Sequence, residues 1–262
     1  MKYIKQIGTY LFLIIFSLFS ILPIYYAVCK ASGGNVDMLK GAMLPGLQLD
    51  ENLFYILFQT PFITSFLYTL MYTSIQTFFT LLVCALAGYG FELYHDKLKD
   101  SFFKIILWIY MIPFTTLVVP TFVIFKDFHL INTTTGIIMP FIASPLIIMV
   151  FRQQSRNFPI EIVEASRMDG LKEPFIFIKM YLPNMKSTLA CGVIIAFLHA
   201  WNSYQWPSII MMNENNIPMT VYLTLGEKGD RMTLVLLSMM PSMLIFFLLQ
   251  RYFVKGMGSA VE

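Results

Sequence analysis

Residues 159–183 read PIEIVEASRMDGLKEPFIFIKMYLP and form the longest interruption of hydrophobicity in the second half of the chain. On both sides lie segments long enough to cross a bilayer, which takes about 20 mostly apolar residues in a helix. Pro159 suits the first position of a helix, where its missing N–H costs nothing, and Gly170 suits the left-handed residue that ends one. Pro174 permits a second helix, which the closing Leu-Pro pair is expected to stop. The stretch therefore predicts a helix–turn–helix at a membrane surface.

The composition of the whole chain excludes an ordinary soluble domain. Of its 262 residues 57% are apolar, 16% are aromatic and only 13% are charged, whereas soluble domains carry about 25% charged residues. No basic cluster alternates with aromatic residues, so nucleic-acid binding has no support. Cys29, Cys84 and Cys191 are odd in number and lie in apolar stretches, which favours buried free thiols over a disulfide framework. We therefore expect an all-α, polytopic membrane protein.

Six segments of the chain are long and apolar enough to span a bilayer. Residues 6–29 exceed the roughly 7–15 apolar residues of a cleavable signal peptide, so we expect this first span to be retained. Pro61 divides the next uncharged run into a short external element, residues 52–60, and a second span, residues 62–91. The other spans are predicted at residues 105–125, 130–151, 187–212 and 232–250.

The distribution of positive charge sets the orientation of these spans. If the N-terminus is cytoplasmic, most of the 18 Lys and Arg residues fall on the cytoplasmic side, where short loops carry an excess of them. This rule places both termini and residues 159–183 in the cytoplasm. The charged side chains of that stretch would then be available to a partner: Glu161, Glu164, Arg167, Asp169, Lys172, Glu173 and Lys179. The basic residues left outside are Lys30, Lys40, Lys126, Lys228 and Arg231.

Internal prolines recur in the predicted spans, at Pro113, Pro120, Pro140, Pro145 and Pro241. Each removes a backbone hydrogen bond, which is tolerable at membrane depth where neighbours or a watery cavity satisfy the freed carbonyl. Kinked helices around a cavity suit a transporter. The alternative is that proline is simply more frequent in membrane helices than in soluble ones.

The fifth predicted span carries the richest polar stretch, HAWNSYQWP at residues 199–207. The spacing of His199, Asn202 and Trp206, with Gln205 three residues beyond Asn202, predicts a shared helix face. Aromatic rings and amides suit a neutral, hydroxyl-rich solute. Alternatively, Asn202 hydrogen-bonds a neighbouring helix and the tryptophans form an interfacial belt. The candidate translocation residues are His199, Trp201, Asn202, Gln205 and Trp206.

The residues and motifs that several functional classes require are absent from this sequence. No predicted span contains Asp, Glu, Lys or Arg, which ion-coupled carriers usually keep near the midplane. The chain has no G-x-x-x-x-G-K-[ST] loop for ATP and none of the hydrolase motifs H-E-x-x-H or G-x-S-x-G, so we expect no catalytic residue. The lone His199 has no second ligand at helical spacing, which disfavours a metal site. Energy for transport would have to arrive through a surface contact.

The spacing within residues 159–183 resembles the EAA loop of permease subunits in binding-protein-dependent ABC importers. That loop reads EAA, three residues, Gly, nine residues, Ile, one residue and Leu-Pro; here Ser166 replaces the second Ala and Met180 replaces Ile. The resemblance covers residues 62 to 262. Within this family, the chain is similar in particular to the MalG-type carbohydrate permeases. The residues expected to couple to an ATPase are Glu164, Ala165, Ser166, Asp169, Gly170, Leu182 and Pro183.

The resemblance implies a type I ABC importer permease fold, with six transmembrane helices and a cytoplasmic EAA coupling helix. An N-terminal helix and external segment would occupy residues 1–61, and the importer transmembrane domain residues 62–262, with the coupling loop at about 157–183. The helix at about 159–169 would lie in a cleft of a separate ATPase, where Glu164 makes polar contacts and Gly170 turns the chain. ATP and Mg²⁺ would bind that ATPase, so no cofactor is expected on this chain.

The resemblance also implies partners and a location. The partners would be a second, MalF-like permease, two ABC ATPase subunits and an extracellular solute-binding protein, assembled in a bacterial cytoplasmic membrane. The external segments, residues 30–61 and 213–231, are long enough to touch a binding protein. The implied solute is a di- or oligosaccharide. Two alternatives stay open: a permease for a non-sugar solute such as a glycerol phosphodiester, and a membrane scaffold or sensor with no ATPase partner.

Overall fold

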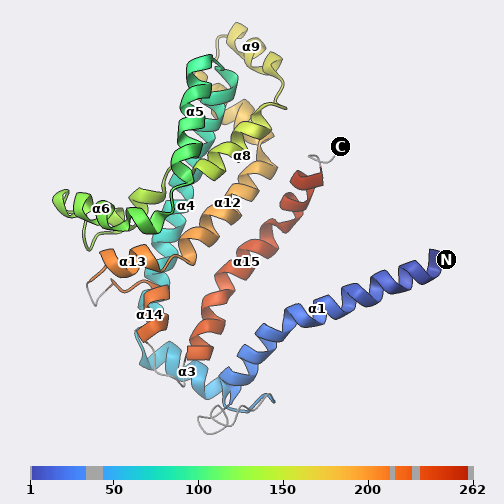
Figure 1. Ribbon diagram of the computed structural model, residues 1–262, viewed down its shortest axis with the longest axis vertical. Helices are drawn as coiled ribbons and strands as arrows, with labels where there is room; N and C mark the ends of the chain where they lie inside the picture. Colours follow the sequence, from blue (N-terminus) through green and yellow to red (C-terminus); the bar gives the residue numbers. More distant parts are fainter. Residues whose placement is uncertain (1, 34–43, 213–215, 226–230, 259–262) are drawn as a thin grey trace. The chain divides into compact units, whose positions relative to one another are not determined.

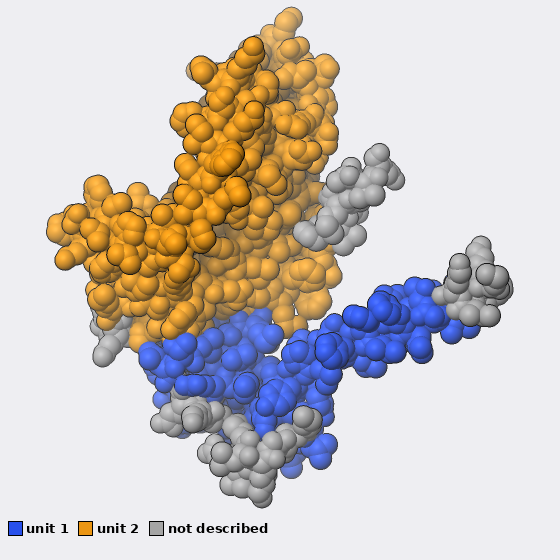
Figure 2. Space-filling view, in the orientation of Figure 1, with its two compact units in different colours: residues 1–66, 222–240 blue, residues 67–221, 241–262 orange. Residues whose placement is uncertain are grey.

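The computed structural model describes residues 2–33, 44–212, 216–225 and 231–258, and every regular element within these ranges is helical (Figure 1). By their internal contacts the residues form two compact units (Figure 2). Unit 1 comprises Met1–Phe66 and Tyr222–Met240, and unit 2 comprises Leu67–Val221 and Pro241–Glu262. The predicted domain boundary at residue 61 stays a prediction. Lys40 and Lys228, expected on the external side, lie outside the described residues.

Unit 1 is built on α1 (Lys2–Ser32) and α3 (Leu49–Gln59). Side chains of α1 are exposed on all sides from residue 6 to residue 26, as expected of a helix whose apolar surface faces lipid. At its other end α1 is tied to α3, because the Asn52 side chain donates to the Ala31 carbonyl at 2.8 Å. The helix α3 confirms the short element predicted at residues 52–60.

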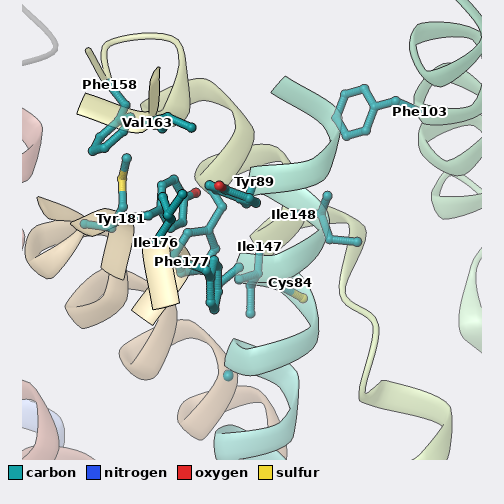
Figure 3. Packing of buried hydrophobic residues seen from close by; sticks show 14 residues of the cluster. Cys84, Tyr89, Phe103, Ile147, Ile148, Phe158, Val163, Ile176, Phe177 and Tyr181 are labelled. Atoms are coloured by element: carbon teal, nitrogen blue, oxygen red, sulfur yellow. The ribbon is translucent and has the colours of Figure 1, made fainter. Parts of the chain in front are cut away.

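Unit 2 holds the main apolar core, in which α4 (Phe62–Leu93) and α8 (Pro145–Ser155) meet the loop quoted above. Figure 3 shows Tyr89 of α4 close to Phe177 and Tyr181, which belong to the π-helical turn η2 (Phe177–Tyr181). The ring centroids of Tyr89 and Tyr181 are 4.8 Å apart at an interplanar angle of 70°, an edge-to-face arrangement that aromatic pairs favour. This core fixes the loop to the membrane helices.

The number of spans agrees with the prediction if bent helix pairs are counted as single spans. Among the described residues, three helices are long and apolar enough to cross a membrane alone: Gln6–Ser32, Phe62–Leu93 and Arg231–Tyr252. Three helix pairs pass the same test together but are bent by 99°, 47° and 85°, which gives up to six spans. The last straight span belongs to α15 (Arg231–Gly258), which contains Pro241 without ending there.

The third and fourth spans are not the continuous helices expected at residues 105–125 and 130–151. The third consists of α5 (Lys97–Tyr110) and α6 (Phe114–Asp127), bent by 99°, and Pro113 stands at the N-cap of α6. The fourth consists of α7 (Thr134–Ile138), the 3₁₀ turn η1 (Met139–Phe141) and α8, bent by 47° in front of Pro145. Each proline lacks an N–H and disfavours helical backbone in the residue before it, so a new helix begins there.

The fifth span, expected at residues 187–212, is interrupted rather than one continuous helix. The helix α12 (Lys186–Trp201) ends before α13 (Gln205–Ile210) begins. The Leu-Pro pair does not stop the preceding helix either, because the turn α11 (Leu182–Asn184) runs through it. The bend of 85° falls at Met185, between α11 and α12.

Candidate functional site

The first candidate site is the helix α9 (Ile160–Met168) in the loop between two membrane segments. Pro159 is its N-cap, one residue before the first helical position at which the sequence analysis had placed it. At the other end Gly170 adopts φ +81°, and the N–H of Leu171 donates to the carbonyl of Ser166 at 3.0 Å. The N–H of Gly170 donates to the carbonyl of Arg167 at the same distance. These bonds form a Schellman motif, which confirms the predicted role of Gly170 as a helix terminator.

The residues of the EAA motif divide between the surface and the core. Glu164, Ala165, Asp169 and Gly170 are exposed. Ser166 is buried, and its hydroxyl donates to the carbonyl of Ile162 at 2.7 Å. Among the two closing residues of the loop, Leu182 is half-buried and Pro183 is exposed.

Exposed apolar residues accompany the acidic ones on α9. Met168 is 89% exposed and Ile160 is 42% exposed, while Val163 is fully buried. Glu164 lies between them along the helix and is exposed as well. A helix with one face in the core and a mixed acidic and apolar face outside suits contact with another protein.

Two charged residues of the loop, Arg167 and Glu173, bind each other and residues at the end of α4, although their side chains remain 40% and 43% exposed. Arg167 Nε lies 2.7 Å from Glu173 Oε1, and its Nη2 donates to the Tyr94 hydroxyl at 2.9 Å. Tyr89 of α4 donates to the other oxygen of Glu173 at 2.9 Å. Partial burial raises the pKa of Tyr94, and the carboxylate of Glu173 raises the pKa of Arg167. This network, Tyr89, Tyr94, Arg167 and Glu173, ties the loop to the end of α4.

A second ionic network, which the sequence analysis missed, links α4, α5 and α8. Arg152 of α8 is 6% exposed, and its guanidinium contacts Glu92 Oε2 at 3.0 Å and also the carboxylate of Asp100. The same guanidinium lies 4.4 Å from the centre of the Phe103 ring. Arg156 Nε contacts the other oxygen of Glu92 at 3.3 Å. The sequence did contain one indication of this network, because acidic and basic residues flank the ends of consecutive predicted spans.

The second candidate site surrounds the polar stretch of the fifth span, where the predicted shared helix face is absent. Trp201 is the last residue of α12, and the side chain of Asn202, its C-cap, donates to the Leu198 carbonyl at 2.9 Å. Gln205 and Trp206 belong to the next helix. Asn202 therefore bonds within its own helix end rather than to a neighbouring helix, and its side chain shares the Leu198 carbonyl with its own backbone N–H, which donates to it at 3.1 Å.

The five candidate translocation residues also differ in exposure. His199, Asn202 and Gln205 are exposed, whereas Trp201 and Trp206 are buried. The indole N–H of Trp206 donates to the Gly136 carbonyl at 2.9 Å, and its ring meets Phe125 edge-on at 5.4 Å. Trp201 stacks on Phe197 at 5.8 Å. The two tryptophans thus pack within this chain, and the three other residues present polar side chains.

A cavity of about 440 Å³ lies beside His199, within unit 2. Its wall comes from α4, α12 and the two proline bends, and it includes Gln76 and Thr80 of α4. Both of these side chains are nearly inaccessible to solvent. The sequence analysis missed them, although Thr69, Thr73, Gln76 and Thr80 recur at helical spacing along the second span. The wall residues are Gln76, Thr80, Ile109, Tyr110, Ile112, Pro113, Phe114, Leu117, Pro140, Phe141, Ala143, Ser144, Pro145, Leu146, Ile147, Ile195, Ala196 and His199.

Comparison with known proteins identifies the family of this chain and two of its relatives. Residues 62–259 match the family model described as "Binding-protein-dependent transport system inner membrane component". The lactose transport system permease protein LacG of Rhizobium radiobacter is 34% identical over 249 residues, which cover 93% of this chain and 91% of that protein. The sn-glycerol-3-phosphate transport system permease protein UgpE of Pectobacterium atrosepticum is 28% identical over 268 residues, with 96% and 95% covered.

A solved structure shares the fold. It is a chain of a bacterial ABC transporter involved in the import of the acidic polysaccharide alginate, and it superimposes with a TM-score of 0.83. The match covers 96% of this chain and 97% of the other, at 22% sequence identity. The all-α fold of a type I importer permease, expected from the EAA loop, is thereby confirmed.

Proposed function

This chain belongs to the family of binding-protein-dependent transport system inner membrane components, and from this premise we propose that it forms half of the pathway for a sugar in an ATP-driven importer. Family membership makes it a multi-pass membrane permease, and ATP hydrolysis then belongs to a separate subunit. The observation that carries the sugar assignment is the cavity beside His199, whose wall contains amide, hydroxyl and aromatic groups but no Lys, Arg, Asp or Glu. Neutral polar groups and rings recognise hydroxyl-rich, uncharged solutes.

The energy for transport enters through α9. Its exposed Glu164 and Met168 dock in a cleft of a separate ATPase subunit, which binds ATP and Mg²⁺ and acts on the cytoplasmic side. Closure of two such ATPases displaces α9, and the network around Arg167 and Glu173 carries this displacement to α4. The membrane helices then move as packed bodies rather than bending individually. A second permease completes the cavity, and an extracellular binding protein delivers the sugar.

A phosphorylated solute is the second candidate, because UgpE is also similar to this chain. Its name assigns it to sn-glycerol-3-phosphate transport. A phosphate group is usually bound by Arg, Lys or backbone N–H groups. No Arg or Lys contributes to the described cavity wall, which favours the neutral sugar.

Uptake by the assembled importer tests the solute. The chain is reconstituted in proteoliposomes with the partners that copurify from its native membrane, and labelled lactose, maltotriose, raffinose and sn-glycerol-3-phosphate are compared. ATP-dependent accumulation of a sugar supports the proposal. Accumulation of the glycerol phosphate alone, or copurification without an ATPase, contradicts it.

The docking role of α9 is tested by a charge reversal with a matched control. We expect Glu164→Lys to abolish ATPase copurification and uptake while the chain stays in the membrane. Glu51 is an exposed acid in the first turn of α3, outside the proposed docking surface, so Glu51→Lys is expected to retain the ATPase. Retention of the ATPase and of uptake by Glu164→Lys would reject the docking assignment.

A further inference from the structure

Gln76 is a buried glutamine in the wall of the cavity beside His199. It is 3% exposed and lies at the middle of α4. Within the described part of the chain no hydrogen bond to its amide is found, and the fully buried polar atoms without a partner belong to Tyr72, Thr73 and Thr77 instead. The amide of Gln76 therefore keeps access to the cavity. Buried amides in folded proteins almost always have a partner, because an unsatisfied amide is costly. The cavity, filled by water or by a solute, therefore supplies the partners of the Gln76 amide.

The neighbours of Gln76 indicate which group that is. Thr80 lies one turn further along α4, is 2% exposed, and uses its hydroxyl proton to bond the Phe141 carbonyl at 3.2 Å. Its oxygen keeps acceptor capacity on the cavity side. The ring of Phe141 also meets His199 edge-on, at 5.2 Å between centroids and an angle of 62°. Phe141 thus holds Thr80 and His199 at one wall of the same cavity.

We propose that Gln76 is a specificity-determining residue, whose amide hydrogen-bonds adjacent hydroxyl groups of a sugar ring as the sugar passes through the cavity. An amide suits this task because its oxygen accepts from one hydroxyl while its nitrogen donates to the next. Thr80 and His199 bond further hydroxyls, and the rings of Tyr110, Phe114 and Phe141 face the C–H surface of the sugar. The inference rests on the proposed sugar transport and identifies Gln76 as a residue that distinguishes one solute from another.

An amide that merely fills the wall would behave differently from one that binds the sugar. In the first case Gln76→Leu, which has a similar volume, would leave transport unchanged. In the second case the variant would lose sugar passage while keeping its fold. Thermal unfolding and transport therefore have to be measured on the same preparation.

The test uses the complete importer in proteoliposomes with labelled lactose, maltotriose and raffinose as probes. The readout is the number of sugars accumulated per ATP hydrolysed, because this ratio separates passage of the sugar from the rate of ATP hydrolysis. We expect Gln76→Leu to lower this ratio about tenfold, the loss of about two neutral hydrogen bonds, with an unchanged midpoint of unfolding. Gln76→Asn, which keeps the amide, is expected to recover part of the ratio. Gln153→Leu, at an exposed glutamine of α8, is the matched control.

Each outcome decides the matter. If the wild-type importer moves at least one probe and Gln76→Leu moves it equally well per ATP, the role of Gln76 is rejected and the sugar assignment stands. If the wild-type importer moves none of the probes, the proposed function fails, and the role of Gln76 fails with it. A lowered ratio that Gln76→Asn partly restores supports both.

Discussion

At the scale of single residues, Gly170 and Trp206 show two different reasons why one residue type is required. Gly170 stands at φ +81°, and a Cβ placed there would meet no atom within 4 Å. The demand on this position is therefore conformational and not steric. Trp206 is required by its surroundings, because its indole N–H is the hydrogen-bond partner of a carbonyl inside the core. Glycine is needed at position 170 for its left-handed backbone conformation, and tryptophan at position 206 for the hydrogen bond that its indole N–H donates.

Gly170→Val is expected to abolish uptake while the chain remains in the membrane. A β-branched residue strongly disfavours the left-handed conformation, so the turn after α9 would shift. Gly170→Asn is the control, since asparagine tolerates this conformation. Uptake and membrane content, measured by immunoblot, are compared for both variants. Normal uptake by the valine variant would show that this turn does not position α9.

Trp206→Phe is expected to destabilise the chain by about 1–3 kcal/mol, since it leaves the buried Gly136 carbonyl without its donor. The lost volume adds to this cost. Trp108 is 74% exposed, so Trp108→Phe serves as the control with little expected effect. Thermal unfolding in detergent measures the difference. Equal midpoints for the two variants would contradict a structural role for the Trp206 indole.

At the scale of elements, the close approach of α4 and α8 sets the rigidity of unit 2. A Cβ at Gly88 would lie 2.5 Å from the Cβ of Phe151 and 3.0 Å from the backbone nitrogen of Arg152. Both neighbours belong to α8, so no side-chain rotation relieves this overlap. The same approach brings Arg152 within reach of Glu92. Helix packing and the ionic network therefore depend on one small residue.

Gly88→Ala is expected to separate α4 from α8 and to lower stability by about 1–3 kcal/mol, the usual cost of overpacking a core. Gly90→Ala, two residues further on, is a matched control because a Cβ there meets nothing within 4 Å. It should stabilise the helix by about 0.5–1 kcal/mol, since alanine loses less backbone entropy than glycine. Midpoints of unfolding that shift equally for both variants would contradict the proposed close contact.

At the scale of the whole molecule, the orientation of the spans decides whether α9 meets a cytoplasmic ATPase. The positive-inside rule predicts that α9 is cytoplasmic and that the segment before α3 is external. Each side offers one accessible probe position, because Met168 is 89% exposed and Leu47 is 96% exposed. The native thiols are buried or half-buried, so they can be replaced to give a silent background.

Labelling of single cysteines in intact cells or spheroplasts tests this orientation. With Cys29, Cys84 and Cys191 changed to serine, a membrane-impermeant maleimide is expected to label Leu47→Cys from outside. Met168→Cys should react only after the membrane is opened, since α9 would lie on the far side. Labelling of Met168→Cys in intact preparations would reverse the predicted orientation and exclude the docking of α9 on a cytoplasmic ATPase.

The sequence by itself determined the helical class, the number of spans and the turn at Gly170. These depend on local signals, because the length of an apolar run, a glycine and the spacing of Glu164, Ser166 and Gly170 are read within one segment. The bends at Pro113 and Pro145 were expected only as kinks. How far a proline turns a helix depends on which helices pack against it, and that information is not local.

Only the tertiary structure decided which polar residues gather at one place. Gln76 and Thr80 meet His199 across more than one hundred residues of sequence, and Arg152 meets Glu92 across sixty. The burial of Trp201 and Trp206 was likewise decided by packing, although both lie in the polar stretch that pointed to the pathway. A side chain in a membrane helix can face lipid, core or cavity with the same local pattern. The neighbouring helices alone determine which of these three it faces.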